Sequence, residues 1–244
     1  HWGVRNDSPI IMDHLKTFLD GTFFPKLEEE GIKTIIHLGD LVDRRKYINY
    51  VTATRLRQDF LDVCKAKGIK VHIIAGNHDT YYKNTNEINA LRELVVGKYD
   101  NVFIYSMAPS LVMFDDTPIV LLPWICNENR DESLKFLSDT KAPIVMAHLE
   151  LAGFEMYRGN ISHDGDDPKL FDRFDLVCTG HYHTRSSRGN IHYLGTPVQY
   201  VWSDFGDDKG FHILDTNTRE LMFHQNPKPI FYKFFYDDLN KQMD

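Results

Sequence analysis

Four short segments of this 244-residue sequence place oxygen and imidazole side chains directly after apolar runs. GDLVDR (residues 39–44) follows the apolar run TIIHL, and GNHD (76–79) follows VHIIA. His148 follows PIVMA, and GHYH (180–183) follows DLVCT. Carboxylates and histidines that gather at one place in a protein serve to bind a cation, to catalyse a reaction, or both. The four segments therefore predict a single cluster, provided that the fold brings them together.

The donor atoms in these segments indicate which cation the cluster would bind. They are carboxylate and amide oxygens and imidazole nitrogens, without a cysteine thiolate, and this set suits Mn²⁺, Fe or Zn²⁺ better than copper or an iron–sulfur centre. His181 and His183 are two residues apart, so on an extended segment both side chains point to the same side. Glycine precedes the donors in three of the segments, where it permits unusual backbone angles and lets the chain pass close to an ion.

Each segment also has a simpler structural interpretation. A Gly-Asp pair after a strand is commonly a turn, and GNHD can form an Asx-turn. His148 can be a hydrogen-bonded core histidine, and GHYH can be a solvated loop. Four such segments in this order, each directly after an apolar run, favour the metal-centre interpretation.

The elements that must position these residues follow from periodicity. Helical spacing predicts helices over 9–30, 50–67, 86–97 and 129–139, and β-rich apolar runs alternate with them. Beyond residue 189, three runs are typical of antiparallel strands separated by turns. The pattern predicts an α/β fold with two stacked mixed β-sheets flanked by helices. In such sheets the carboxyl ends of parallel strands line one crevice, which would collect all four segments.

Composition narrows the class of protein. The sequence is 42% hydrophobic and 26% charged, as in ordinary globular proteins, and no apolar run approaches the ~20 residues of a membrane span. Three widely spaced cysteines and the lack of a signal peptide predict a reducing, cytoplasmic location. The net charge of −7 argues against a surface that coats nucleic acid, but DNA can still be a substrate, because bound cations reverse the local field.

The four segments together resemble the signature of the calcineurin-like metallophosphoesterases. That family also has an Asp-x-His motif at the end of its first strand; His1 resembles the His of this motif, which implies that the Asp and the first strand are missing upstream. HWGV (1–4), LLPWICNEN (121–129), AHLELAGF (147–154) and GTPVQY (195–200) are similar to the nuclease subunits of SbcC–SbcD complexes, particularly the T-even-like bacteriophage version. The resemblance implies a nuclease domain over 1–229 and the start of a linker or capping-domain segment over 230–244.

The resemblance also implies roles for individual residues. Two divalent metal ions are expected, Mn²⁺ before Mg²⁺, Fe or Zn²⁺, with one carboxylate bridging them. A histidine would lie beside the scissile phosphate, an aspartate would orient its ring, and an arginine behind the ligands would hold carboxylates. The resemblance implies that Asp40 would bridge the two metals, with His1 and His183 at the first and Asn77, His148 and His181 at the second. His78 would lie beside the phosphate, and Asp43 would orient its ring. Arg44 would be the arginine that holds carboxylates.

The function implied is a DNA exonuclease or endonuclease that hydrolyses phosphodiester bonds. It would work as a homodimer with an SbcC-type ATPase in double-strand break processing and recombination, in the host cytoplasm if the gene is carried by a phage. Two alternatives stay open: a phosphatase or small phosphodiesterase with the same dimetal centre, and a non-catalytic scaffold with the same fold. The choice of substrate distinguishes the phosphatase or small phosphodiesterase from the nuclease. Loss of the donor residues is typical of the scaffold.

Overall fold

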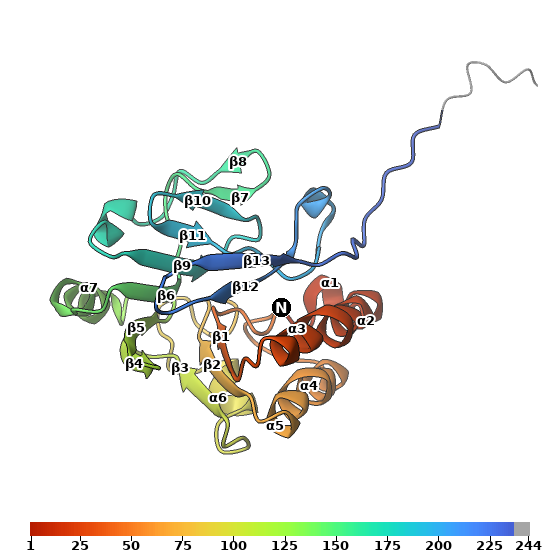
Figure 1. Ribbon diagram of the computed structural model, residues 1–244, viewed down its shortest axis with the longest axis horizontal. Coiled ribbons are helices and arrows are strands. Elements are labelled where there is room, and N and C mark those ends of the chain that lie inside the picture. The colour runs from red at the N-terminus through yellow and green to blue at the C-terminus, as the bar shows by residue number, and fades with distance from the viewer. Residues whose placement is uncertain (237–244) are drawn as a thin grey trace, which may run out of the picture.

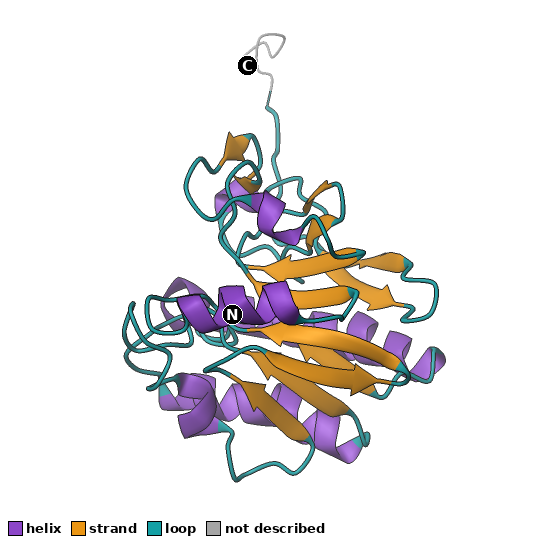
Figure 2. Ribbon diagram, turned by 90° about the vertical axis from the view of Figure 1, so that its left-hand side faces the viewer, coloured by secondary structure: helices purple, strands orange, loops and turns teal. Residues whose placement is uncertain are grey.

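Two β-sheets lie face to face in the middle of the molecule, with helices on both outer sides (Figures 1 and 2). The computed structural model describes residues 1–236. Apolar side chains pack in three layers: between the first sheet and its helices, between the two sheets, and between the second sheet and its outer cover. The predicted α/β fold with stacked sheets is confirmed.

The first sheet is parallel, with the strand order β1-β2-β3. Its side chains alternate between the two layers: Val71 and Ile73 belong to the helix-side core, whereas Ile36 and Ile74 belong to the core between the sheets. This two-sided burial explains the continuous apolar runs in the sequence. The elements are β1 (Thr34–His37), β2 (Lys70–Ile74), β3 (Val102–Tyr105) and the helices α2 (Pro9–Phe18), α3 (Phe24–Glu29), α4 (Tyr50–Leu56) and α5 (Asp62–Ala66).

The second sheet is mixed, with the order β10-β11-β9-β6-β5-β4. Its four central strands are parallel, and the edge strands β4 and β10 are antiparallel to their neighbours. The first of the three runs beyond residue 189, NIHYL (190–194), was predicted to be an antiparallel strand. It forms β11, which pairs in parallel with β9 and is antiparallel only to β10. The elements are β4 (Ser110–Phe114), β5 (Thr117–Leu122), β6 (Ile144–His148), β9 (Leu176–Gly180), β10 (Ser186–Arg188), β11 (Ile191–Tyr193) and α7 (Arg130–Asp139).

The remaining elements are short. The predicted helix over 9–30 continues from α2 to α3 through a π-helical turn at Leu19–Phe23, and the one over 50–67 has a similar turn at Arg57–Leu61. The predicted helix over 86–97 is wrong in extent, because the Asn89 side chain caps the helix by accepting a hydrogen bond from Arg92 N. The others are α1 (Val4–Asp7), α6 (Ala90–Leu94), the 3₁₀ turns Pro168–Phe171 and Trp202–Asp204, and the hairpins β7 (Glu155–Tyr157) with β8 (Asn160–Ile161) and β12 (Gly210–Leu214) with β13 (Leu221–Gln225).

A cavity of about 870 Å³ runs along β1 and β12 and reaches His1. β1 is the edge strand of the first sheet, and β12 pairs only with β13 in the described part of the chain. An extended segment in this cavity could pair with both strands. The predicted strand upstream of His1 stays a prediction.

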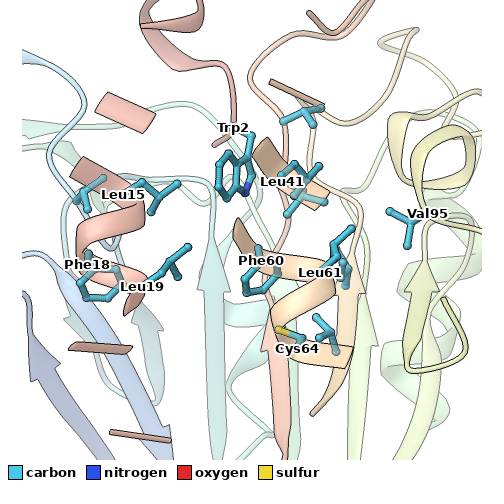
Figure 3. Packing of buried hydrophobic residues seen from close by; sticks show 14 of the residues in the cluster. Trp2, Leu15, Phe18, Leu19, Leu41, Phe60, Leu61, Cys64 and Val95 are labelled. Atoms are coloured by element: carbon cyan, nitrogen blue, oxygen red, sulfur yellow. The ribbon is translucent and has the colours of Figure 1, made fainter. Parts of the chain in front are cut away.

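Trp2 anchors the start of the chain in the helix-side core (Figure 3). Trp2 is 4% exposed. Its main-chain N–H donates to Leu41 O at 2.8 Å, and its main-chain carbonyl accepts from Asp43 N at 2.9 Å. These bonds hold residues 1–3 parallel to the segment after β1, in a bridge that pairs Trp2 with Val42. His1 is thereby fixed beside the GDLVDR segment.

Beyond β13 the described chain has no helix or strand. Ile230 N and Phe231 N still donate to Gln199 Oε1 at 3.0 and 3.1 Å, and the chain then extends away from the body of the molecule (Figure 1). Phe234 and Phe235 are 92% and 95% exposed there. Residues 237–244, the rest of the predicted linker or capping segment, lie outside the described residues, and the predicted boundary at 229 stays a prediction. No helix among the described residues is long and apolar enough to cross a membrane.

Candidate metal centre

The four sequence segments meet at one edge of the two sheets, because each follows the carboxyl end of a parallel strand. GDLVDR follows β1 and GNHD follows β2 in the first sheet. In the second sheet, His148 ends β6 directly opposite Gly180, which ends β9 and leads into GHYH. The predicted gathering of these segments is therefore what the structure shows.

Glycines let the loops at this edge approach one another closely, within the first sheet and between the two sheets. A Cβ at Gly76 would lie 2.2 Å from Asp40 Oδ1, and a Cβ at Gly39 would lie 2.4 Å from His148 Nδ1. Gly39 also has a φ of 92°, a backbone angle that residues with side chains rarely adopt. The glycines seen in the sequence are thus required by close packing around the donors.

The first donor group consists of Asp40, Asn77, His148 and His181. His148 Nε2 is 2.9 Å from Asn77 Oδ1, 3.3 Å from His181 Nδ1 and 3.5 Å from Asp40 Oδ2. His181 Nδ1 is also 3.0 Å from Asn77 Oδ1. The other nitrogen of His148, Nδ1, lies 2.7 Å from Leu38 O, a bond in which the imidazole must donate. In the neutral ring Nε2 therefore presents its lone pair to the other donors.

Burial shapes the protonation of this group. It lowers the pKa of His181 to about 3, with His148 adding to the effect. Burial acts to raise the pKa of Asp40, but the imidazoles of His148 and His78 and the His78 main-chain N–H outweigh it and hold that pKa below its usual value. At neutral pH the group therefore presents an ionised carboxylate beside a neutral imidazole, which are the forms that bind metal ions.

The second donor group surrounds His1. His1 Nε2 is 3.8 Å from Asp40 Oδ2, and His1 Nδ1 is 3.8 Å from Asp43 Oδ1. The ring centre of His1 lies 5.0 Å from that of His183 and 5.2 Å from that of His78. Burial lowers the pKa of His183 to about 3, so its imidazole is also neutral. Asp40 thus lies between the two groups.

His78 is tied to both acids. Its main-chain N–H donates to Asp40 Oδ1 at 2.7 Å, and its ring Nδ1 is 2.5 Å from the main-chain carbonyl of Asp43. Asp43 was predicted to orient this ring, and the contact runs through its carbonyl, while its carboxylate faces His1. The ligand atoms of His1, Asp43 and His78 lie within 4.8 Å of one another. The roles of all these residues stay predictions.

Residues 11–185 match the sequence profile of the family described as calcineurin-like phosphoesterase. The chain belongs to this family. Its similarity extends to Exonuclease subunit 1 of Enterobacteria phage T4, at 36% identity over 230 residues, 93% of this chain and 65% of that protein. It is also 26% identical to the D subunit of nuclease SbcCD from Staphylococcus saprophyticus over 248 residues, 89% of this chain and 64% of that protein. The chain spans just under two thirds of the length of these relatives.

The solved structures agree with this fold. A crystal structure of a protein from Thermus thermophilus has a TM-score of 0.50 against this phosphoesterase and 12% sequence identity, over 88% of this chain and 93% of that chain. At this identity the likeness shows a shared fold alone. The predicted family and fold class are confirmed.

The family implies divalent metal ions, and the donors of this phosphoesterase fit them. Asp40, His148 and His181 place their ligand atoms within 4.8 Å of one another, with Asn77 Oδ1 among them. Lone pairs that face one another at such distances repel unless a proton or a cation lies between them. Among the described residues, His1 Nδ1 is buried without a hydrogen-bond partner.

Arg44 holds a carboxylate, but not one of the donor groups. Its Nη1 is 2.7 Å from Asp7 Oδ2, and its Nη2 is 2.7 Å from Asn6 Oδ1. Asp7 also accepts a hydrogen bond from Thr52 Oγ1 at 2.7 Å. Arg44 therefore fastens the N-terminal segment that carries His1 to the loop after β1.

Two site residues escaped the sequence analysis. The Asp79 carboxylate is fully buried and accepts from Gly76 N at 2.8 Å and from Val42 N at 3.1 Å, which ties the loops after β1 and β2 together. Burial raises the pKa of Asp79 to about 7, and the nearby charge of Asp40 adds to this. The ring of Tyr200 lies 5.6 Å from that of His1 and 5.7 Å from that of His183. GNHD and GTPVQY contained both residues, but nothing in their spacing indicated these contacts.

A buried lysine supports the backbone of His183. Lys209 is 4% exposed; its Nζ donates to His183 O at 2.7 Å and lies 3.2 Å from Asp204 Oδ1 and 3.3 Å from Asp207 Oδ2. Asp204 in turn accepts from Tyr200 N at 2.7 Å. This network links the segment that precedes β12 to His183 and Tyr200.

We expect Gly76→Ala to lower the affinity for Mn²⁺ by about tenfold or more, because the new methyl group displaces the Asp40 carboxylate. Isothermal titration with Mn²⁺ measures this. Gly21→Ala is the matched control, since a Cβ there meets no atom within 4 Å. Equal Mn²⁺ affinity in the two variants would contradict the close approach of Gly76 and Asp40.

We expect Lys209→Met to lower the free energy of unfolding by about 3–5 kcal/mol, because Asp204 and Asp207 would be left buried without their cation. Urea denaturation measures the change. The control is Lys135→Met, whose exposed pair with Asp139 should contribute little. A Lys209 variant as stable as this control would show that the network does not hold the fold.

Proposed function

We propose that this chain is the catalytic part of a dimetal-dependent DNA nuclease that hydrolyses phosphodiester bonds. The observation that carries the proposal is the pair of donor groups that share Asp40, with His78 bonded to Asp40 and Asp43 between them. The similarity to Exonuclease subunit 1 of phage T4 and to the D subunit of nuclease SbcCD supports DNA as the substrate. The scaffold alternative is disfavoured because the predicted donors lie together.

The residues divide the work. Asn77, His148 and His181 would hold one ion, His1 and His183 another, and Asp40 both; Mn²⁺ is the proposed metal. Bound ions supply positive charge that draws electron density from the phosphate and activates water. Asn77 is a neutral oxygen donor, which keeps the site electrophilic. The bond from His78 Nδ1 to the Asp43 carbonyl makes Nδ1 the donor and fixes the ring, so that Nε2 can exchange a proton with the leaving oxygen or, when protonated, donate to the phosphate.

Partners are part of the proposal. The names of both relatives describe them as subunits, and we propose an SbcC-type ATPase as the partner here, in recombination and double-strand break processing in the cytoplasm. We also propose a homodimer. Tyr50 and Val51, 91% and 62% exposed at the start of α4, offer apolar surface for such an interface.

The test uses the full-length protein with Mn²⁺ or Mg²⁺ on linear duplex DNA, single-stranded DNA and an aryl phosphate monoester. We expect degradation of DNA in Mn²⁺ that stops when a chelator is added. Turnover of the monoester with DNA left intact would favour the phosphatase instead. No turnover of any substrate, despite bound Mn²⁺ and added ATPase partner, would favour the scaffold.

A further inference from the structure

A small pocket adjoins the first donor group on the side of His148. Its volume is about 180 Å³, and His148 lines it together with Trp124 and Glu150. The pocket lies between the connection from β5 to α7, the end of β6, and the loop around Gly165. His148, which is 1% exposed, thus belongs both to the donor group and to the lining of the pocket, so the two sites are separated by a single residue.

Trp124 is held in a fixed position on one wall. Its main-chain N–H donates to Ala75 O at 2.8 Å, and its carbonyl accepts from Asn86 Nδ2 at 2.9 Å. The guanidinium carbon of Arg45 lies 5.2 Å from the centre of an indole ring that remains half-buried. The guanidinium lies over one face of the ring, and because the ring as a whole is only half-buried, a flat aromatic surface is left for stacking.

Another part of the pocket lining consists of Glu150, Gly165 and Asp166, whose main chains lie close together. Asp166 N donates to Glu150 O at 2.9 Å, and a Cβ at Gly165 would lie 2.4 Å from the same oxygen. Asp166 is paired with Arg130, whose Nη1 is 3.2 Å from its Oδ2. The carboxylates of Glu150 and Asp166 against one guanidinium leave the pocket with acceptor character and a net negative charge, which disfavours a phosphate.

We propose that this pocket binds one nucleobase of the DNA substrate, the base next to the phosphate that is cleaved. The inference rests on the proposed nuclease function and extends it. The volume is well below the ~300–1,000 Å³ of sites that enclose a whole ligand, so it suits a single ring system. Trp124 supplies the stacking surface, and Glu150 accepts from exocyclic amino groups. A phosphate at the donor group and a base in the pocket are then adjacent parts of one nucleotide.

The first experiment compares substrates with and without a base. For the full-length protein, we measure kcat/KM in Mn²⁺ on a single-stranded oligonucleotide and on bis(p-nitrophenyl) phosphate, and take the ratio. Trp124→Ala should lower this ratio about tenfold, within the range of a lost base–aromatic stack. Trp202→Ala is the matched control, since Trp202 is 54% exposed, stacks on Phe205 and lies outside the pocket.

An abasic residue next to the cleaved bond should lower the wild-type ratio by a similar factor and should not lower the Trp124→Ala ratio further. Losses that multiply, or no loss in the Trp124 variant, would overturn the pocket. If the wild type cleaves the aryl diester but no DNA, the proposed function fails on its own. Quenching of tryptophan fluorescence by dAMP then decides about the pocket: loss of quenching in Trp124→Phe but not in Trp202→Phe supports it, and quenching that persists in Trp124→Phe overturns it.

Discussion

Replacing His78 with alanine is expected to lower the rate of phosphodiester hydrolysis by about 10²–10⁴-fold while Mn²⁺ binds as before. The ring of His78 is fixed by the Asp43 carbonyl at 2.5 Å, and its main-chain N–H, which alanine retains, is what binds Asp40. The substitution therefore removes the group that can transfer a proton and leaves the Asp40 carboxylate in place. Single-turnover cleavage of an oligonucleotide and Mn²⁺ titration of the same preparation measure the two quantities.

The structure also allows another outcome for His78. Its ligand atom lies within 4.8 Å of those of His1 and Asp43, so it could itself belong to a metal site. Parallel loss of Mn²⁺ affinity and activity in His78→Ala would establish that role and contradict the catalytic one. His163→Ala is the control, because His163 is exposed in the loop after β8. It should leave both quantities unchanged.

The sequence predicted that the donors gather, because the ends of buried strands can be recognised from the sequence alone. A buried parallel strand is a continuous apolar run, and the residue types that follow it reach the same edge of the sheet in every such unit. Asp40, Asn77, His148 and His181 could therefore be placed together from the sequence alone. The same strands are apolar on both faces, so that Val71 and Ile74 of β2 pack in different cores.

What the sequence did not predict depends on contacts between distant segments. Asp79 serves the site through the main chain of Val42, and Lys209 through the carbonyl of His183. A side chain that binds main-chain atoms places no demand on the residue type at the other end, so it leaves no pattern. The helix over 86–97 failed for a related reason: Asn86 and Asn89 bind main-chain groups and compete with helix formation.

Replacing Asp40 with asparagine is expected to abolish the stabilisation of the fold by Mn²⁺ and to lower phosphodiester hydrolysis by about 10³-fold or more, the loss of several kcal/mol of charge stabilisation. Asparagine suits the test because Asp40 has a φ of 56°, which asparagine tolerates and most other residues do not. It keeps an oxygen for the His78 N–H and removes only the charge.

The shift in melting temperature on adding Mn²⁺ separates the shared carboxylate from its neighbours, because a ligand that binds only the folded state stabilises it. In Asp40→Asn the shift should vanish, because one oxygen faces both donor groups: Asp40 Oδ2 lies 3.5 Å from His148 Nε2 and 3.8 Å from His1 Nε2. In the control Asp43→Asn part of the shift should remain, because the Asp43 carboxylate approaches His1, which belongs to the second group. With a chelator present, Asp40→Asn should be less stable than the wild type at neutral pH, because a carboxylate whose pKa is held below its usual value stabilises the fold in its ionised form. A full Mn²⁺ shift in Asp40→Asn would show that the two donor groups bind metal independently of the carboxylate between them.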